Sequence, residues 1–204
     1  MRTFRLSSTV AALSIILAVA FFSTTQAAQQ ANQQSAQDDK PANKVRIKNF
    51  GCLNETFYRG AQPREQDYAE LAAMGVKTVI DLQKGGDNRE EAMVEATGMK
   101  FYRIGMSDKS QPAAEQAELF LKIVNDPASQ PVFVHCAGGR HRTGAMSAIY
   151  RMTHDGWTAD QAFKEMKQYD FEYGMGHMPL KHYVYDYYSH IDQKSVVVNT
   201  GSNR

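Results

Sequence analysis

Cys136 and Arg142 are the residues whose types and spacing point most directly to chemistry. A cysteine thiolate is a nucleophile, and an arginine guanidinium is a planar, two-pronged donor that matches a phosphoryl group. Cys136 follows the apolar run Pro131–His135, and Arg142 lies six residues later, where a helix is expected to start. Gly138 and Gly139 lie between them and allow backbone angles that a Cβ would obstruct. The segment therefore predicts a strand, a tight turn and a helix start in succession.

This succession predicts a binding site for a tetrahedral anion with a sulfur atom at its base. The amides of a tight turn at a helix start converge on one point, and the helix dipole adds positive potential there. The same field stabilises the thiolate form of Cys136 and activates it as a nucleophile. We expect the backbone of the following residues to bind the phosphate: Ala137, Gly138, Gly139, Arg140, His141 and Arg142.

The reaction predicted from these residues is the hydrolysis of a phosphate monoester. The sulfur of Cys136 would attack phosphorus, and water would then hydrolyse the cysteinyl-phosphate. Thr143 can donate a hydrogen bond to that sulfur or to the phosphorylated intermediate. Because Arg142 and the amides neutralise the phosphoryl charge, we expect neither a metal ion nor another cofactor. The six histidines show no paired spacing of the kind that metal ligands have.

The segment resembles the signature of the cysteine-dependent protein tyrosine and dual-specificity phosphatases. His135, Cys136, Arg142 and Thr143 each match that motif at their own positions. The likeness covers roughly residues 45–188, one catalytic domain, and it extends to three segments of the small bacterial and atypical dual-specificity phosphatases: Phe57–Pro63, Val76–Leu82 and Pro131–His135. Rhodanese-like sulfurtransferases differ in loop spacing, and low-molecular-weight phosphatases carry their loop near the start of the chain.

The resemblance implies a general acid, an aspartate in a loop before the cysteine. Asp108 fits, since it follows the expected strand Met99–Ile104 and precedes Cys136 by 28 residues. A positioned acid of this kind contributes about 10²–10⁴ in rate. Asp81, at the end of an expected buried strand, is a weaker alternative, and Asp87, in a turn, is a candidate substrate contact.

The resemblance also implies a phosphorylated protein or a small phosphate ester as the substrate. Phosphotyrosine is the first expectation, because a deep site selects a long aromatic ester, whereas a shallower site also accepts phosphoserine and phosphothreonine. The segment Gly139–Gly144 is similar to that of plant and fungal phosphatases that cleave inositol pyrophosphates, although these carry a basic residue where this chain has Ala137. Cysteine phytases are a related alternative. A module that binds phosphate without turnover is the alternative from another class, and the intact Cys136 and Arg142 disfavour it.

Strands and helices are expected to alternate around this loop. Strands are predicted at 45–50, 57–59, 76–82, 99–104 and 131–135, and helices at 64–74, 88–97, 113–125, 143–154, 158–169 and 179–191. Thr158 and Gln161 have the spacing of a capping box. The alternation predicts a single α/β domain over residues 44–193, with a central, mainly parallel sheet flanked by helices. His135 is expected to hold the loop through hydrogen bonds.

Composition and charge narrow the functional classes. The chain has 204 residues, 43% of them hydrophobic and 22% charged, which is typical of a globular domain. With 23 Lys and Arg against 22 Asp and Glu, nucleic acid is not an expected partner. Two cysteines cannot form a disulfide-rich scaffold. Cys136 must stay reduced for the proposed chemistry, so we expect no permanent bridge; Cys52 is interpreted as a small buried residue, with a redox role as the alternative.

The ends of the chain carry separate predictions. Residues 1–27 have the features of a secretory signal, with Arg2 and Arg5 before an apolar run and Thr25-Gln26-Ala27 at a cleavage site. This predicts a periplasmic or secreted protein that leaves the membrane after cleavage; an uncleaved anchor is the alternative, although a membrane span needs about 20 apolar residues. Residues 28–43 are polar and Gln-rich, which predicts a disordered linker. Residues 194–204 are expected to form a flexible tail, to which 196–198 could add a short strand.

Overall fold

The structure, a computed structural model, describes residues 45–172, 174 and 176–201, with side chains described up to residue 191. The secretory signal predicted at 1–27 and the linker predicted at 28–43 lie outside the described residues. Everything that follows concerns the domain that begins at Val45.

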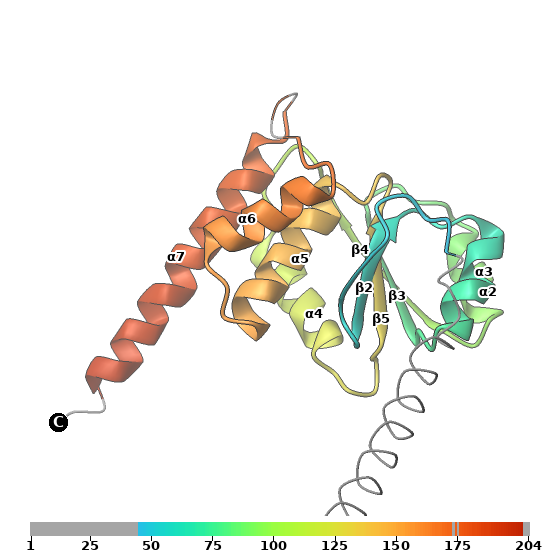
Figure 1. Ribbon diagram of the computed structural model, residues 1–204, viewed down its shortest axis with the longest axis horizontal. Coiled ribbons are helices and arrows are strands. Elements are labelled where there is room, and N and C mark those ends of the chain that lie inside the picture. Colours follow the sequence, from blue (N-terminus) through green and yellow to red (C-terminus); the bar gives the residue numbers. More distant parts are fainter. Residues whose placement is uncertain (1–44, 173, 175, 202–204) are drawn as a thin grey trace, which may run out of the picture. The chain divides into compact units, whose positions relative to one another are not determined.

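A five-stranded sheet forms the centre of the domain (Figure 1). Its strands are β1 (Gly51–Asn54), β2 (Phe57–Ala61), β3 (Thr78–Gln83), β4 (Lys100–Met106) and β5 (Val132–Cys136), in the order β1-β2-β5-β3-β4. β1 pairs with β2 in an antiparallel hairpin, and all other pairs are parallel. The expectation of a central, mainly parallel sheet is confirmed.

The prediction of a strand at residues 45–50 is wrong. This segment contains a turn, in which the Phe50 amide donates to the Ile47 carbonyl at 3.3 Å, and Asn49 has a φ of 54°. A residue in the left-handed region interrupts an extended chain, so the first strand begins only at Gly51.

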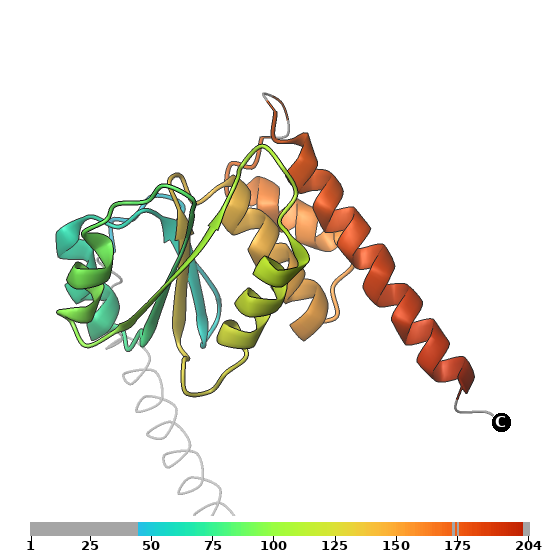
Figure 2. The same cartoon turned by 180° about the vertical axis from the view of Figure 1, so that it is seen from behind.

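Helices cover both faces of the sheet (Figures 1 and 2). On one face lie α2 (Glu65–Ala73) and α3 (Glu90–Glu95); on the other lie α4 (Ala114–Val124), α5 (His141–His154), α6 (Ala159–Gln168) and α7 (Met178–Gly201). The capping box is confirmed, since the Thr158 amide donates to Oε1 of Gln161 at 2.8 Å and its hydroxyl accepts from the Gln161 amide at 3.3 Å.

The last helix is longer than predicted. The expected end was residue 191, whereas the backbone is helical to Gly201, which includes most of the expected flexible tail. No glycine or proline occurs between Leu180 and Thr200, so nothing in this stretch breaks the helix. None of the helices in the described part of the chain has the length and apolar character needed to cross a membrane.

β5 is the central strand and is buried along its whole length. Val132 and Val134 belong to the apolar cluster on the α4–α7 side, and Phe133 belongs to the cluster on the α2–α3 side. Burying a large apolar side chain contributes about 1.5–3 kcal/mol, so packing on both faces fixes the strand firmly. Cys136, the last residue of β5, is thereby held at a fixed point.

Candidate active site

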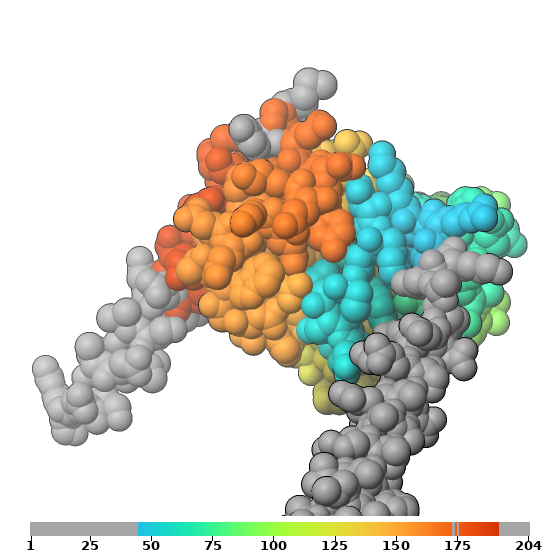
Figure 3. All heavy atoms as spheres, in the orientation of Figure 1, coloured from blue at the N-terminus to red at the C-terminus, as the bar shows by residue number. Residues whose placement is uncertain are grey.

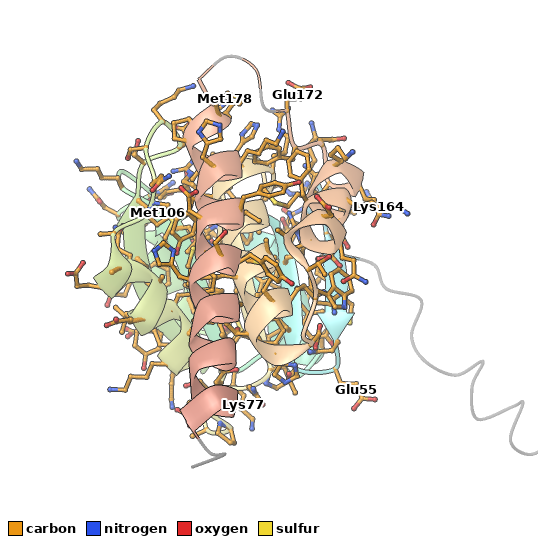
Figure 4. The ribbon with its side chains drawn as sticks, turned by 90° about the vertical axis from the view of Figure 1, so that its left-hand side faces the viewer. Glu55, Lys77, Met106, Lys164, Glu172 and Met178 are labelled. Atoms are coloured by element: carbon orange, nitrogen blue, oxygen red, sulfur yellow. The ribbon has the colours of Figure 1, made fainter. Side chains whose placement is uncertain are left out.

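The carboxyl ends of the parallel strands lie at one edge of the sheet. Ala61 of β2 pairs with Cys136, and Asp81 of β3 pairs with His135. Figure 4 has Glu172, in the connection between α6 and α7, and Met178, the first residue of α7, at one end of the molecule, and Lys77, which precedes β3, at the other. The α6–α7 connection therefore lies at the carboxyl edge, where ligands of open α/β sheets bind.

Three successive carbonyl groups of the 136–142 loop accept hydrogen bonds from outside the loop. The carbonyl of Ala137 accepts from the Gln62 amide at 3.3 Å. The carbonyl of Gly138 accepts from Nδ2 of Asn49 at 2.8 Å, and that of Gly139 accepts from Nη2 of Arg59 at 2.6 Å.

These bonds orient the N–H groups of the same peptides. A trans peptide is planar, with its C=O and N–H pointing in opposite directions. The carbonyls are held toward β2 and the segment before β1, so the amides of Gly138, Gly139 and Arg140 point the opposite way. α5 begins at His141, two residues earlier than predicted, so its first turn adds amides that lack a partner within the helix. Inward-facing amides at a helix start are an arrangement that is suited to an anion.

Gly139 is required for this backbone. Its φ of +66° lies in the left-handed region, and a Cβ there would come within 2.5 Å of the carbonyl carbon of Gly60. Both its conformation and its contact with β2 exclude a side chain. The close approach also brings the Gly139 carbonyl within reach of Arg59.

Cys136, Arg142 and Thr143 lie where the sequence predicted. Cys136 is 3% exposed at the end of β5, and Arg142 and Thr143 lie in the first turn of α5. Nε of Arg142 and Oγ1 of Thr143 are buried, and neither makes a hydrogen bond within the described part of the chain. Because buried donors are nearly always paired in native proteins, unpaired ones beside an anion site are suited to a bound ligand.

His135 is held by a buried carboxylate. Its Nε2 lies 2.8 Å from Oε1 of Glu90, and both side chains are fully buried. The same oxygen accepts from the Tyr68 hydroxyl and from Nε2 of Gln62, each at 2.8 Å. Burial raises the pKa of Glu90, but the interactions with His135, Tyr68 and Gln62 outweigh it and hold that pKa below the ordinary value. The hydrogen bonds expected from the His135 ring to the 136–142 loop are not seen in the described part of the chain, where Glu90 is the close polar neighbour of the ring.

Asp81 is not available as a general acid. It is fully buried on β3, where its carboxylate accepts from Nε of Arg103 and from the Gln83 amide, each at 2.8 Å. Asp81, Glu90 and His135 offer atoms within 4.8 Å of one another that could ligate a metal ion. The carboxylates of Asp81 and Glu90 already accept hydrogen bonds from other residues, so we interpret the cluster as a structural support for this edge of the sheet.

The other two candidate aspartates, Asp87 and Asp108, are partly exposed and lie in connections between elements. Asp87 pairs with Arg89 at 2.9 Å, and its carbonyl accepts from Nη2 of Arg103 at 2.7 Å. Asp108 is half-buried in the connection between β4 and α4, and its carbonyl lies 3.1 Å from Nδ1 of His177. Figure 2 has this connection beside the segment that leads into α7.

Asp108 is linked to the 136–142 loop through two histidines. The ring of His177 stacks on that of His141, with centroids 3.5 Å apart and an interplanar angle of 12°. Burial and the charges of His177 and Arg140 lower the pKa of His141 to about 4, against the opposing effect of the Asp108 carboxylate. The Asp108 carboxylate therefore lies close enough to His141, in the 136–142 loop, for their charges to interact.

Several residues of this site were missed by the sequence reasoning. Arg59 was within a segment that carried the resemblance, but no role was assigned to it; a charged residue inside a buried strand was the available signal. Asn49 and His177 come from other connections and Glu90 from the start of α3, and only their contacts reveal them. Cys52, expected to be buried, is exposed on β1, because this strand forms the edge of the sheet.

Comparisons with known proteins agree with this geometry. The model of the family described as "DSP-PTPase phosphatase fused to NAD+ Kinase" matches residues 23–178. Inositol diphosphatase SIW14 of Saccharomyces cerevisiae is 29% identical over 129 residues, 60% of this chain and 46% of that protein. Dual specificity protein phosphatase TpbA of Pseudomonas aeruginosa is 30% identical over 125 residues, 60% of this chain and 55% of that protein. The chain thus spans about half the length of these relatives.

A solved structure also matches. The crystal structure of a cysteine-to-serine variant of P. aeruginosa TpbA in complex with phosphotyrosine superposes with a TM-score of 0.58 at 25% identity. The match covers 72% of this chain and 90% of that chain. The similarity therefore extends over most of the described domain.

Proposed function

Since the chain belongs to this family of cysteine-dependent, dual-specificity-type phosphatases, we propose that it hydrolyses phosphate monoesters through a cysteinyl-phosphate intermediate. The observation that carries the proposal is the 136–142 loop, whose carbonyls are tied outward by Gln62, Asn49 and Arg59 while Cys136 lies at its base.

The first step forms a bond between sulfur and phosphorus. The loop amides and Arg142 hold the phosphoryl oxygens, and Sγ of Cys136 attacks the phosphorus on the side opposite the ester oxygen. As the P–O bond breaks, Asp108 gives its proton to the leaving oxygen. The alcohol or phenol departs with that proton, and the phosphoryl group stays on the sulfur.

The second step returns the enzyme to its starting state. A water molecule attacks the phosphorus and gives up a proton to the Asp108 carboxylate, and the P–S bond breaks. Thr143, whose hydroxyl has no hydrogen-bond partner within the described residues, donates to the departing sulfur. Inorganic phosphate is released, and Cys136 is again a thiolate.

The activity is tested with purified, reduced protein and an aryl phosphate. We expect turnover that Cys136→Ser abolishes, because serine at this position is a far weaker nucleophile. Cys52→Ser is the matched control and should keep the activity, since Cys52 lies on the exposed edge strand. A wild-type protein without turnover, or equal rates in the Cys136→Ser variant, would refute the proposal. A protein that binds inorganic phosphate without turnover would support the non-catalytic binding module instead.

We propose phosphotyrosine as the first substrate class, supported by the similarity to TpbA, a structure of which is in complex with phosphotyrosine. Inositol pyrophosphates are the second candidate, supported by the similarity to the inositol diphosphatase SIW14 and by two basic residues of the loop, Arg140 and Arg142. Turnover of a phosphotyrosyl peptide, a phosphothreonyl peptide, inositol hexakisphosphate and an inositol pyrophosphate should be compared. A higher kcat/KM for the inositol pyrophosphate would reverse the order of the candidates.

We propose that the protein is exported, on the basis of residues 1–27 alone. Expression of the full chain in a bacterial host, followed by fractionation and N-terminal sequencing, tests this proposal. A mature N-terminus near Ala28 in the periplasmic or secreted fraction is expected. Protein with an intact N-terminus in the membrane fraction would favour the uncleaved anchor.

A further inference from the structure

Asn49 and Arg59 reach the 136–142 loop from two different segments. Asn49 lies in the turn before β1 with a φ of 54°, a conformation that asparagine tolerates better than most residues. Arg59 lies in the middle of β2. Each donates one hydrogen bond to a loop carbonyl, Asn49 to Gly138 at 2.8 Å and Arg59 to Gly139 at 2.6 Å.

The burial of Arg59 is costly for the protein. The side chain is fully buried, and its Nε and Nη1 make no hydrogen bond within the described residues. Its guanidinium carbon lies 3.9 Å from the ring centroid of Tyr169, the residue that follows α6. In Figure 3 the atoms of α6 adjoin those of the β1–β2 hairpin. The Gly139 carbonyl and the Tyr169 ring contact the guanidinium, and the charge of Glu165 also favours its cationic form. A buried cation with two unpaired donor nitrogens is still costly for the free protein.

The buried charge of Arg59 can interact with Cys136 and with a bound phosphate. Burial lowers the pKa of Arg59 to about 10, against the opposing charges of Tyr169, Glu165 and Cys136, so the side chain stays cationic at neutral pH. Arg59 is therefore close enough to Cys136 for their charges to interact. A phosphate dianion bound above Cys136 would add further compensating charge.

We propose that Asn49 and Arg59 are positioning residues that set the oxyanion affinity of the loop without touching the substrate. They hold two carbonyls outward, so the amides of Gly139 and Arg140 face the phosphate before it binds. Without either donor the corresponding peptide can rotate, and the loop would lose an aligned N–H donor. This inference rests on the proposed function of the loop as a phosphate site.

The test is the affinity of the full-length protein for inorganic phosphate, measured by isothermal titration calorimetry. Asn49→Asp keeps the shape and the left-handed backbone but replaces the donor by an acceptor, and Asn49→Gly keeps only the backbone. We expect about tenfold weaker phosphate binding in both variants, the equivalent of one lost hydrogen bond to a charged group. Asn54→Asp is the matched control, because Nδ2 of Asn54 donates to the Tyr150 hydroxyl, remote from the loop.

Arg59 is tested by a conservative pair. Arg59→Met should weaken phosphate binding more than Asn49→Asp does, since both a donor and a buried charge are lost, and Arg59→Lys should restore part of it. Melting temperatures are measured in parallel. If Arg59→Met does not fold, the Asn49 variants decide the matter, since Asn49 is only half-buried.

The outcomes separate this inference from the proposed function. Phosphate affinity in Asn49→Asp and Asn49→Gly equal to that of the Asn54→Asp control would overturn the inference, even if the enzyme is active. Wild-type protein that turns over aryl phosphate but binds no phosphate would also overturn it. If the Asn49 variants bind phosphate more weakly than the wild-type protein, and the wild-type protein turns over no aryl phosphate, the inference is supported and the phosphatase activity is refuted.

Discussion

Replacement of Glu90 by glutamine should destabilise the domain strongly. Glu90 is fully buried, one of its oxygens lies 2.8 Å from Gln62, Tyr68 and His135, and the other lies 3.5 Å from Nη2 of Arg103. Glutamine keeps the shape but removes the negative charge that pairs with Arg103 and accepts hydrogen bonds from Tyr68 and Gln62. Breaking a buried ion pair in this way costs about 3–5 kcal/mol.

The predicted cost translates into a clear change of melting temperature. For a domain of about 150–250 residues, each kcal/mol shifts the melting temperature by about 2–4 °C, so Glu90→Gln should lower it by about 6–20 °C. Circular dichroism at neutral pH measures this shift. Tyr68→Phe removes only one hydrogen bond to the carboxylate and should cost about 1.5–3 kcal/mol, which gives a graded second variant.

Asp87→Asn is the matched control for the loss of a carboxylate charge. Its pair with Arg89 lies on an exposed turn, where solvent screens the interaction, so the change should be small. A Glu90→Gln variant whose melting temperature falls no more than that of Asp87→Asn would show that the Glu90 carboxylate does not stabilise the domain. The activity should follow, because His135 adjoins Cys136 and loses its partner.

The pH dependence of stability provides a second check on Glu90. Its pKa in the folded protein is below the ordinary value of 4.5. The unfolded chain therefore binds a proton more readily, and the contribution of Glu90 to stability is fully present above pH 4.5 and is lost as the pH falls through the lower, folded value. In Glu90→Gln this part of the acid destabilisation should be missing from a denaturation series.

Three further predictions concern the loop and its neighbours. Gly139→Ala should abolish phosphate binding, because its Cβ would overlap the Gly60 carbonyl; calorimetry that finds wild-type affinity would contradict this. His141 has a pKa of about 4, below the ordinary 6.5, so the free energy of unfolding should fall as the pH drops from 6.5 toward 4, and His141→Phe should remove that part of the slope in urea titrations. His177→Phe should slow substrates with poor leaving groups more than good aryl phosphates, since it loses the bond to Asp108; equal effects on both would argue against an indirect role in proton transfer.

Much of the fold could be predicted because the relevant patterns are local. The buried runs at 76–82 and 131–135 and the helical periodicity at 113–125 and 158–169 reflect which faces pack, and packing in an α/β domain follows directly from such alternation. The failures occurred at the edges. The segment 45–50 alternates like a strand, but the left-handed backbone of Asn49 makes it a turn. The side chain of Asn49 donates a hydrogen bond to the Gly138 carbonyl in the 136–142 loop.

For the site, the sequence determined the residues that are close to one another along the chain. Cys136, Arg142 and Thr143 could be proposed as site residues because one strand, one turn and one helix start carry them all, and the structure has these elements in that order. Asp108 was predicted through the resemblance, and the structure adds its link to the loop through His177 and His141.

Only the tertiary structure decided what holds the loop in shape. Asn49, Arg59 and Glu90 lie 89, 80 and 45 residues from their partners Gly138, Gly139 and His135, and no periodicity connects residues so far apart. Their contacts exist because parallel strands end together at one edge of the sheet, so that connections distant in sequence meet there. A chemical group can be recognised in a sequence by its type, whereas its orientation depends on donors that the fold brings to it.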